Sequence, residues 1–267
     1  MIEDIGSRAL LVENLKAALR TFALTRVEAH VFPLPGMLCV YSGLKGGVFN
    51  AVMFTEVVTD EKEFREKLAW VDAEYKALGA RWTIWVVEHF LPAALRAMAP
   101  KILEGYQLAP QVRSPGMVAE TLIPKRRELP ALEILPVYAP ALRYDFCYVM
   151  AQAFKTSMKT FLDMYHTAEY WDGPLKGFIG YQDGRAVGTV CTMDHSGVIG
   201  LYGVATHPDS QRRGVGEKMV RYALESATQS ARQTKPIVLE SSLAAVRLYE
   251  RMGFAQVTTV TIYSEPK

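Results

Sequence analysis

The segment 206–220, THPDSQRRGVGEKMV, has residue types that could bind an anion at the start of a helix. Its apolar residues have helical spacing, yet two glycines, Gly214 and Gly216, stand at its beginning. Each costs about 1 kcal/mol relative to alanine inside a helix, so each needs a local reason. Unpaired N–H groups at a helix N-terminus attract phosphate, which approaches closely where no Cβ intervenes. Because Arg212 and Arg213 add full positive charge, the turn predicts a pyrophosphate site.

The elements around this turn alternate between strand and helix patterns. Residues 196–206 read as a strand, a helix follows from Gly214 to about Ser230, and PIVLE is a second strand. A further helix, SLAAVRLYERM, and a closing strand, AQVTTVTIYS, end the chain. Upstream, two helices precede LKGFIGYQDGRAVGTVCTMD, which predicts two strands joined at an Asp183-Gly184 hairpin turn. The fold class is therefore α/β.

The first part of the chain shows a similar alternation. A helical stripe begins at Ser7, and MLCVYSG and GVFNAVMF are strand-like. Asp60 and Glu63 form a capping pair before the next helix, and RWTIWVV is a buried strand that leads into a helix from about Pro92. The order of RWTIWVV, helix and LEGYQL repeats as PIVLE, helix and ERMGFAQV, which is a weak internal repeat.

Between the two parts, closely spaced prolines indicate a linker, and its KRRE run is a solvated face. We therefore expect a first domain over residues 1–124, a linker over 125–138 and a second domain over 139–267.

The pattern Gln211, Arg212, Arg213, Gly214, Val215, Gly216 resembles motif A, [QR]xxGx[GA], of the GNAT superfamily of acyl-CoA-dependent N-acyltransferases. Upstream, GLYGVATHP is similar to the family's fourth strand, and downstream SLAAVRLYERMGF is similar to its second conserved block. The resemblance covers about residues 140–267. For the first half it rests on element order alone. It implies two tandem GNAT-like folds with a mixed sheet, the first half being degenerate.

The resemblance implies a set of acetyl-CoA contacts. Backbone groups of three strand residues would meet the pantetheine arm and thioester: Val204, Ala205 and Thr206. The pyrophosphate would lie against the turn and the helix start: Gln211, Arg212, Arg213, Gly214, Val215, Gly216 and Glu217. Ser242 stands where many relatives have an asparagine that contacts CoA. Tyr249 matches the tyrosine that protonates the departing thiolate, and a neutral phenol is a reasonable donor at neutral pH.

The general base is not assigned from the sequence. Asp194 and Glu240 are the strand-end carboxylates near the right elements, and either could be a base or a solvated charge. In the first half the acidic segment EVVTDEKEF replaces the glycine turn, and Lys101 stands at the position of Tyr249. Its acidity would repel a pyrophosphate, so we expect the first half to be structural and to wall one side of the acceptor site.

The sequence thus predicts an N-acetyltransferase that transfers an acetyl group from acetyl-CoA to a primary amine of a small molecule or peptide, by direct attack in a ternary complex. The alternative is a non-catalytic acyl-CoA-binding sensor. A net charge of +2 argues against nucleic acid as a partner, and no apolar run reaches the ~18 residues of a membrane span. No histidine spacing indicates a metal, and three distant cysteines are typical of reduced thiols in a cytoplasmic protein. The acceptor and the oligomeric state are left open.

Overall fold

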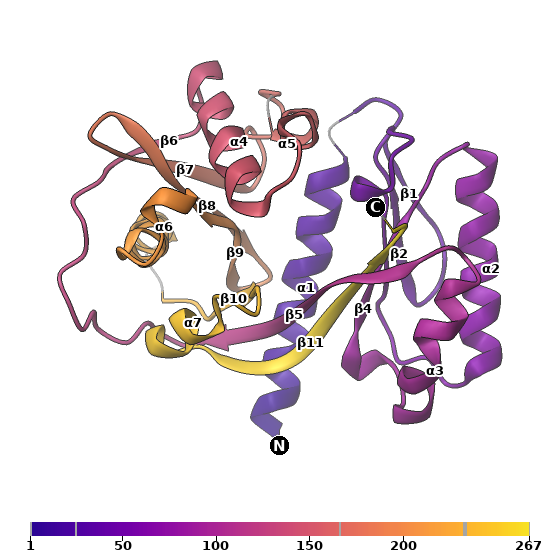
Figure 1. Cartoon of the computed structure of the whole chain (residues 1–267). Helices are drawn as coiled ribbons and strands as arrows, with labels where there is room; N and C mark the ends of the chain where they lie inside the picture. The colour runs from indigo at the N-terminus through magenta and orange to yellow at the C-terminus, as the bar shows by residue number, and fades with distance from the viewer. Residues whose placement is uncertain (1, 25, 166, 232–233, 267) are drawn as a thin grey trace.

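The computed structural model describes residues 2–24, 26–165, 167–231 and 234–266, and Figure 1 shows two α/β halves with a long helix between them. The first half contains α1 (Ile2–Ala23), β1 (His30–Phe32), β2 (Met37–Tyr41), η1 (Gly47–Phe49), β3 (Ala51–Phe54), α2 (Glu61–Ala77), β4 (Thr83–Val87), η2 (Glu88–Phe90), α3 (Ala93–Glu104) and β5 (Ala109–Ala119). The second contains β6 (Glu133–Pro136), α4 (Pro140–Phe154), α5 (Met158–Tyr165), β7 (Leu175–Gln182), β8 (Arg185–His195), β9 (Val198–Thr206), η3 (Pro208–Ser210), α6 (Val215–Ala231), β10 (Ile237–Glu240), α7 (Val246–Met252) and β11 (Ala255–Ser264).

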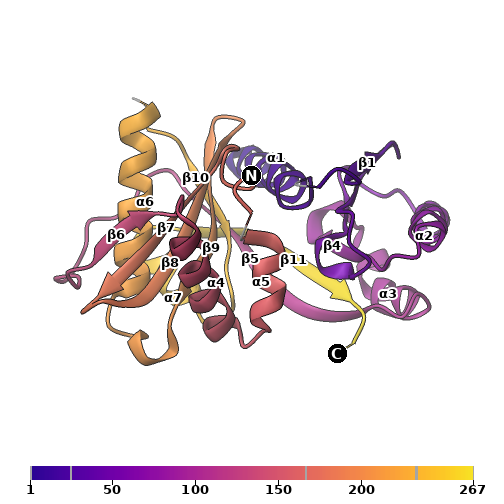
Figure 2. The same ribbon diagram turned by 90° about the horizontal axis from the view of Figure 1, so that it is seen from above.

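All eleven strands form a single sheet, in the order β1-β2-β3-β4-β11-β5-β10-β9-β8-β7-β6. The last strand of each half lies beside the other half. β11 pairs antiparallel with β4 of the first half, and β5 pairs antiparallel with β10 of the second. β5 and β11 also pair with each other along most of their length. The two halves are therefore joined by exchanged strands, which run through the middle of the molecule in Figure 2.

Helices cover both faces of this sheet. In the second half, α6 and α7 pack on one face and α4 and α5 on the other. In the first half, α2 and α3 pack on one face and α1 on the other. α1 also contacts β8, β9, β10 and β5, so it spans the junction. Asn14 of α1 is fully buried and donates hydrogen bonds to the carbonyls of Met193 and Val198 at 3.2 and 3.3 Å. This polar contact attaches α1 to the second half.

The local predictions are largely confirmed. Asp183 and Gly184 have φ values of 50° and 73°, as a two-residue hairpin turn with positive φ requires. Asp60 caps α2 and accepts from the N–H of Glu63 at 2.8 Å. Glu63 reaches back to the N–H of Thr59 at 2.7 Å, one residue before the cap. The predicted internal repeat corresponds to β4-α3-β5 and β10-α7-β11.

Other features were not anticipated. β5 was missed because Pro110 and Pro115 interrupt its pattern. α1 begins at Ile2, so Ser7 lies inside the helix and does not cap it. β6, at residues 133–136, lies within the predicted linker and pairs with β7. All three cysteines are buried and unpaired. Within the described part of the chain, no helix combines the length and apolarity needed to cross a bilayer.

Candidate acyl-transfer site

The site begins where β9 and β10 separate. These parallel strands pair only from Ile199 to Leu201 on β9, opposite residues 237–239 on β10. β9 continues to Thr206, so its last five residues have no partner on that edge among the described strands. Gly203 has φ +55°, and the β8 pairing skips a residue there. A bulge of this kind bends the strand just after the point where its pairing with β10 ends.

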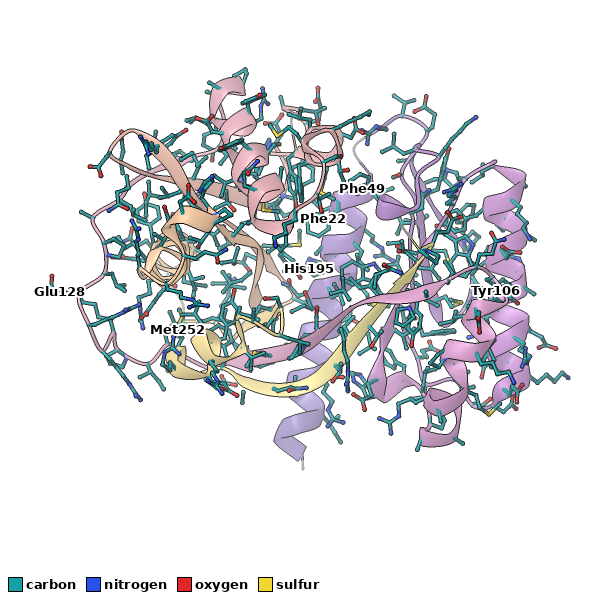
Figure 3. The ribbon with its side chains drawn as sticks, viewed as in Figure 1. Phe22, Phe49, Tyr106, Glu128, His195 and Met252 are labelled. Atoms are coloured by element: carbon teal, nitrogen blue, oxygen red, sulfur yellow. The ribbon has the colours of Figure 1, made fainter. Side chains whose placement is uncertain are left out.

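A cavity of about 250 Å³ lies beside the open edge. Both halves contribute to its lining, which consists of Phe22, Trp85, Ser114, Met150, Phe154, Tyr165, Leu201, Tyr202, Gly203, Val204, Glu240, Ser242, Ala245, Tyr249 and Ile262. Phe22 lies near the centre of the molecule, where the halves meet (Figure 3). The sequence predicted Val204, Ser242 and Tyr249 as site residues, and the structure brings these three together in the cavity.

Tyr249 enters the cavity from α7. Its side chain is buried, with its ring edge against Phe254 at 5.5 Å between centroids. Its hydroxyl has no hydrogen-bond partner among the described residues, although it is not sealed from the cavity. Burial raises the pKa of this phenol, so it stays protonated at neutral pH. The hydroxyl is therefore a proton donor with no competing protein acceptor. Lys101, at the matching position of α3, is exposed.

The two candidate carboxylates have different surroundings. Glu240 ends β10, lines the cavity, and is only partly exposed. Burial raises the pKa of its carboxyl to about 8, and the backbone N–H of the same residue partly offsets this rise. Asp194 instead forms an ion pair with Lys235 at 2.6 Å, outside the cavity. The geometry therefore leaves Glu240 as the candidate base.

Glycine stands at the two positions of the turn for different physical reasons. Gly214 has φ +90°, a conformation that side-chain-bearing residues rarely adopt, and its missing Cβ would meet Pro130 and Leu129 of the linker at 3.2 and 3.3 Å. Gly216 lies inside α6 without a positive φ. A Cβ there would make ordinary contacts with Thr206 at 3.4 Å and with α7 at 3.7 Å. Packing within the protein therefore does not require a glycine at position 216. Close approach of a ligand to the helix backbone would require one.

The charged residues of the turn differ in exposure and in their partners. Arg212 and Arg213 are exposed, and neither has an ion-pair partner among the described residues. Arg213 also lines a wider cavity of about 880 Å³ beside the β7–β8 turn. Glu217 pairs with Arg221 at 2.8 Å, so its carboxylate is neutralised beside the helix start. Gln211 donates to the carbonyl of Thr206 at 3.3 Å and holds the turn against the end of β9.

The remaining predicted contacts are mainly backbone positions. The side chain of Ala205 is buried in the core beneath α4 and α5, and that of Val215 is buried in the core between α6, α7 and the sheet. Each residue could therefore offer only its peptide group to a ligand. Ser242 is exposed at the cavity mouth. Ser241 and Ser242 do not cap α7, because that helix begins after Ala245 without a side-chain cap.

Sequence reasoning missed most of the lining, and four of the missed residues come from elements far from the predicted motifs: Phe22, Trp85, Ser114 and Ile262. They come from α1, β4, β5 and β11, so no local motif marks them, and their position depends on the strand exchange. No group of side chains in the described residues could hold a metal ion. The first-half segment at the position of the glycine turn, between β3 and α2, contains no glycine and supplies the cap of α2.

Comparison with known proteins agrees with this architecture. Residues 145–254 match the family model described as Acetyltransferase (GNAT) family. A mycothiol acetyltransferase of Thermomonospora curvata is 31% identical over 101 residues, which are 37% of this chain and 34% of that protein. One of Mycobacterium avium is 29% identical over 116 residues, 37% of each chain. The chain thus matches about a third of the length of these curated relatives.

Similarity to solved structures extends over nearly the whole chain. A GCN5-related N-acetyltransferase from Kribbella flavida superposes with a TM-score of 0.68 at 17% identity, covering 96% of both chains. A tandem GNAT protein from the clavulanic acid biosynthesis pathway superposes with a TM-score of 0.55 at 9% identity, covering 98% of this chain and 94% of that one. Residues 145–254 therefore resemble a GNAT-family acetyltransferase domain, within a fold that matches a tandem GNAT protein over almost its entire length.

Proposed function

We propose that this protein transfers an acetyl group from acetyl-CoA to a primary amine by direct attack within a ternary complex. The observation that carries the proposal is the cavity at the separation of β9 and β10, which has Tyr249 in its wall and the glycine turn at the end of the same strand. A thioester lying along the open edge of β9 would place its sulfur within the cavity that Tyr249 lines.

The proposed contacts follow from the geometry of this edge. Backbone groups of Val204, Ala205 and Thr206 would pair with the pantetheine arm as a strand partner would. The N–H groups of residues 213–217 would bind the pyrophosphate, with Arg212 adding charge. The backbone N–H near Val204 would polarise the thioester carbonyl. Ser242 would also contact CoA, and its exposed position at the cavity mouth fixes this contact less closely than the others.

The chemistry needs two proton movements. The amine loses a proton and its nitrogen forms a bond to the thioester carbon. The carbon–sulfur bond then breaks, and the thiolate takes the proton of the Tyr249 hydroxyl. The proton that the amine nitrogen loses on forming the amide restores this hydroxyl. The products are an amide and free CoA, with one further proton released to water when the substrate begins as an ammonium ion. A phenol kept neutral by burial suits the second movement.

An acyl-CoA sensor is the alternative, and a single experiment separates the two. Purified protein is mixed with acetyl-CoA and a panel of amines, and free thiol is followed with time. Amine-dependent thiol release supports the enzyme, whereas tight acetyl-CoA binding without release for any amine would favour the sensor. We further propose a cytoplasmic location, which the three buried, unpaired cysteines support.

A further inference from the structure

The charge of the cavity is unusual for a site that must bind a polar acceptor. Among the fifteen described residues that line it, Glu240 is the one carboxylate, and none is a lysine, arginine or histidine. Its tyrosines are held neutral, because burial raises the pKa of Tyr165, Tyr202 and Tyr249. The hydroxyl of Tyr202 is already engaged with Asn14 at 2.7 Å. The described lining thus offers one acidic group, which becomes negative near pH 8, and no basic group.

We propose that the acceptor is a small monoamine with an apolar or aromatic body and no carboxylate, bound between the exchanged strands with its amino group at Glu240. This inference rests on the proposed acetyltransferase function and names its substrate class. It also assigns a role to the first half, which supplies part of the wall that contacts the acceptor body.

The walls fit an apolar body. Phe22 and Trp85 enter from the first half, while Phe154 and Ile262 enter from the second, and all four line the cavity. Apolar contact of this kind is worth about 25 cal/mol per Å² of surface removed from water. Aromatic faces also attract a cation placed over them. The volume of about 250 Å³ is below the ~300–1,000 Å³ of typical ligand pockets, so the acceptor must be small.

Glu240 fits the amino end. Its carboxyl lies at the cavity with no other side chain bonded to it in the described chain. An ammonium ion would therefore be its first charged partner. The attraction between the two charges would offset the cost of removing each of them from water. After binding, the proton passes from the ammonium to the Glu240 carboxylate, and the freed nitrogen lone pair attacks the thioester carbon. A base is most effective when its pKa lies near the working pH, and that of Glu240 is about 8.

The same arrangement rejects two other classes of amine. An amino acid would bring a carboxylate that finds no cation among the described lining residues, and burying an unpaired charge is costly. A diamine would bring a second ammonium, for which the same residues supply no second carboxylate. A site that leaves a buried charge unpaired discriminates strongly, whereas an extra methylene changes rates by only about 10- to 200-fold.

The test uses three acceptors with acetyl-CoA and the full chain: 2-phenylethylamine, phenylalanine and 1,4-diaminobutane. We expect kcat/KM for 2-phenylethylamine to exceed each of the others by at least about tenfold. Preference for phenylalanine or for the diamine would overturn the assigned class while leaving the acetyltransferase function intact. Acetyl-CoA binding with no turnover of any acceptor in a wider amine panel would instead overturn the proposed function itself.

Two matched pairs of variants, the first with an added conservative substitution, test the residues. Glu240→Gln should lower kcat/KM for 2-phenylethylamine by about 10²- to 10⁴-fold and remove the rise of activity near pH 8, with acetyl-CoA affinity retained. Glu240→Asp should recover part of the loss. Asp194→Asn, which removes a strand-end carboxylate outside the cavity, is the matched control and should change little. An unchanged pH profile in Glu240→Gln would exclude Glu240 as the proton acceptor.

The second pair addresses the first half. Trp85→Ala removes an aromatic wall, and we expect it to raise KM for 2-phenylethylamine by at least about tenfold while acetyl-CoA affinity changes little. Trp70→Ala makes the same change in the first half outside the cavity, where Trp70 packs edge-on against Phe32, and should leave KM unchanged. Equal effects of the two variants would show that the first half does not contact the acceptor.

Discussion

Glu240, the last residue of β10, stands directly opposite Gly116 of β5, a strand that comes from the first half of the chain. The next residue continues this attachment, because the N–H of Ser241 donates to the carbonyl of Pro115 at 2.8 Å. The strand end that carries the candidate base is therefore held by backbone contacts from the other half. A half that lacks its own glycine turn still positions a group in the proposed reaction.

The first prediction concerns Tyr249. Tyr249→Phe removes one hydroxyl that has no partner among the described residues, so stability and acetyl-CoA affinity should barely change. If the phenol protonates the thiolate, the chemical step should slow by roughly 10²- to 10⁴-fold in single-turnover measurements. Tyr222→Phe, on α6 outside the cavity, is the control. A rate within about threefold of the parent would assign Tyr249 a packing role.

The second prediction concerns Gly216. Gly216→Ala should stabilise α6 by up to about 1 kcal/mol, because alanine is the better helix former. It should also weaken acetyl-CoA binding by at least about tenfold, since a Cβ that the protein accommodates with ordinary contacts would still stand between the helix backbone and an approaching phosphate. Gly6→Ala in α1, where nothing lies within 4 Å, should share the gain in stability without the loss of affinity.

Calorimetry and thermal unfolding of both variants give the comparison. Equal acetyl-CoA affinities of Gly216→Ala and Gly6→Ala would show that the pyrophosphate does not bind at this turn. Gly214 is a poorer test than Gly216, because its φ of +90° would strain any residue with a side chain. A loss of affinity in a Gly214 variant could then come from unfolding and not from the lost contact.

The third prediction concerns pH and Glu240. The pKa of its carboxyl is raised from 4.5 to about 8 in the folded protein, so the folded state keeps a proton that the unfolded state has released. Stability from this group is thus intact below about pH 4.5 and falls as the pH rises to about 8. Glu240→Gln should therefore be more stable than the parent at pH 9, on the order of 1–3 kcal/mol, and similar at pH 4.

Denaturant unfolding at the two pH values checks this difference. The other titratable side chains of the cavity, Tyr165, Tyr202 and Tyr249, remain neutral over this range and do not obscure the comparison. A variant equally stabilised at both pH values would indicate a packing effect and not the titration of Glu240.

The elements that the sequence predicted well are those whose signals are local. Capping by Asp60, the Asp183-Gly184 turn and the glycine turn at Gly214 each depend on a few neighbouring residues and their backbone conformations. The same holds for Tyr249, which a short helix followed by Gly253 places at the cavity.

What the sequence did not predict depends on contacts between distant segments. β5 contains two prolines and reads as a covering segment until β10 and β11 lie on either side of it. Trp85 and Ile262 face each other across the β4–β11 pair, 177 positions apart in the chain, and no periodic pattern joins them. For the same reason the sequence could not decide between Glu240 and Asp194 as the candidate base. The burial of Glu240 depends on a cavity that both halves build. The division into domains 1–124 and 139–267 stays a prediction.

The last prediction follows from the exchanged strands. We expect the isolated segment 136–267 to be poorly soluble, because β10 would lose β5 as a partner and β11 would lose both β4 and β5. Free strand edges of this kind promote aggregation. We expect the surface covered by α1 and β5 to be on the order of hundreds of Å² of apolar area, at about 25 cal/mol per Å². That sum is comparable with the ~5–15 kcal/mol net stability of a domain.

Two controls make the result specific to the exchange. Residues 125–267 retain β6 and should be no more soluble, whereas co-expression with residues 1–124 should restore solubility, since that piece supplies both α1 and β5. Size-exclusion chromatography and unfolding with added CoA give the readout. A monodisperse fragment 136–267 that unfolds cooperatively and binds CoA with the affinity of the full chain would show that the second half folds alone. In that case β5 would be dispensable for placing Glu240, and the first half would have no part in the site.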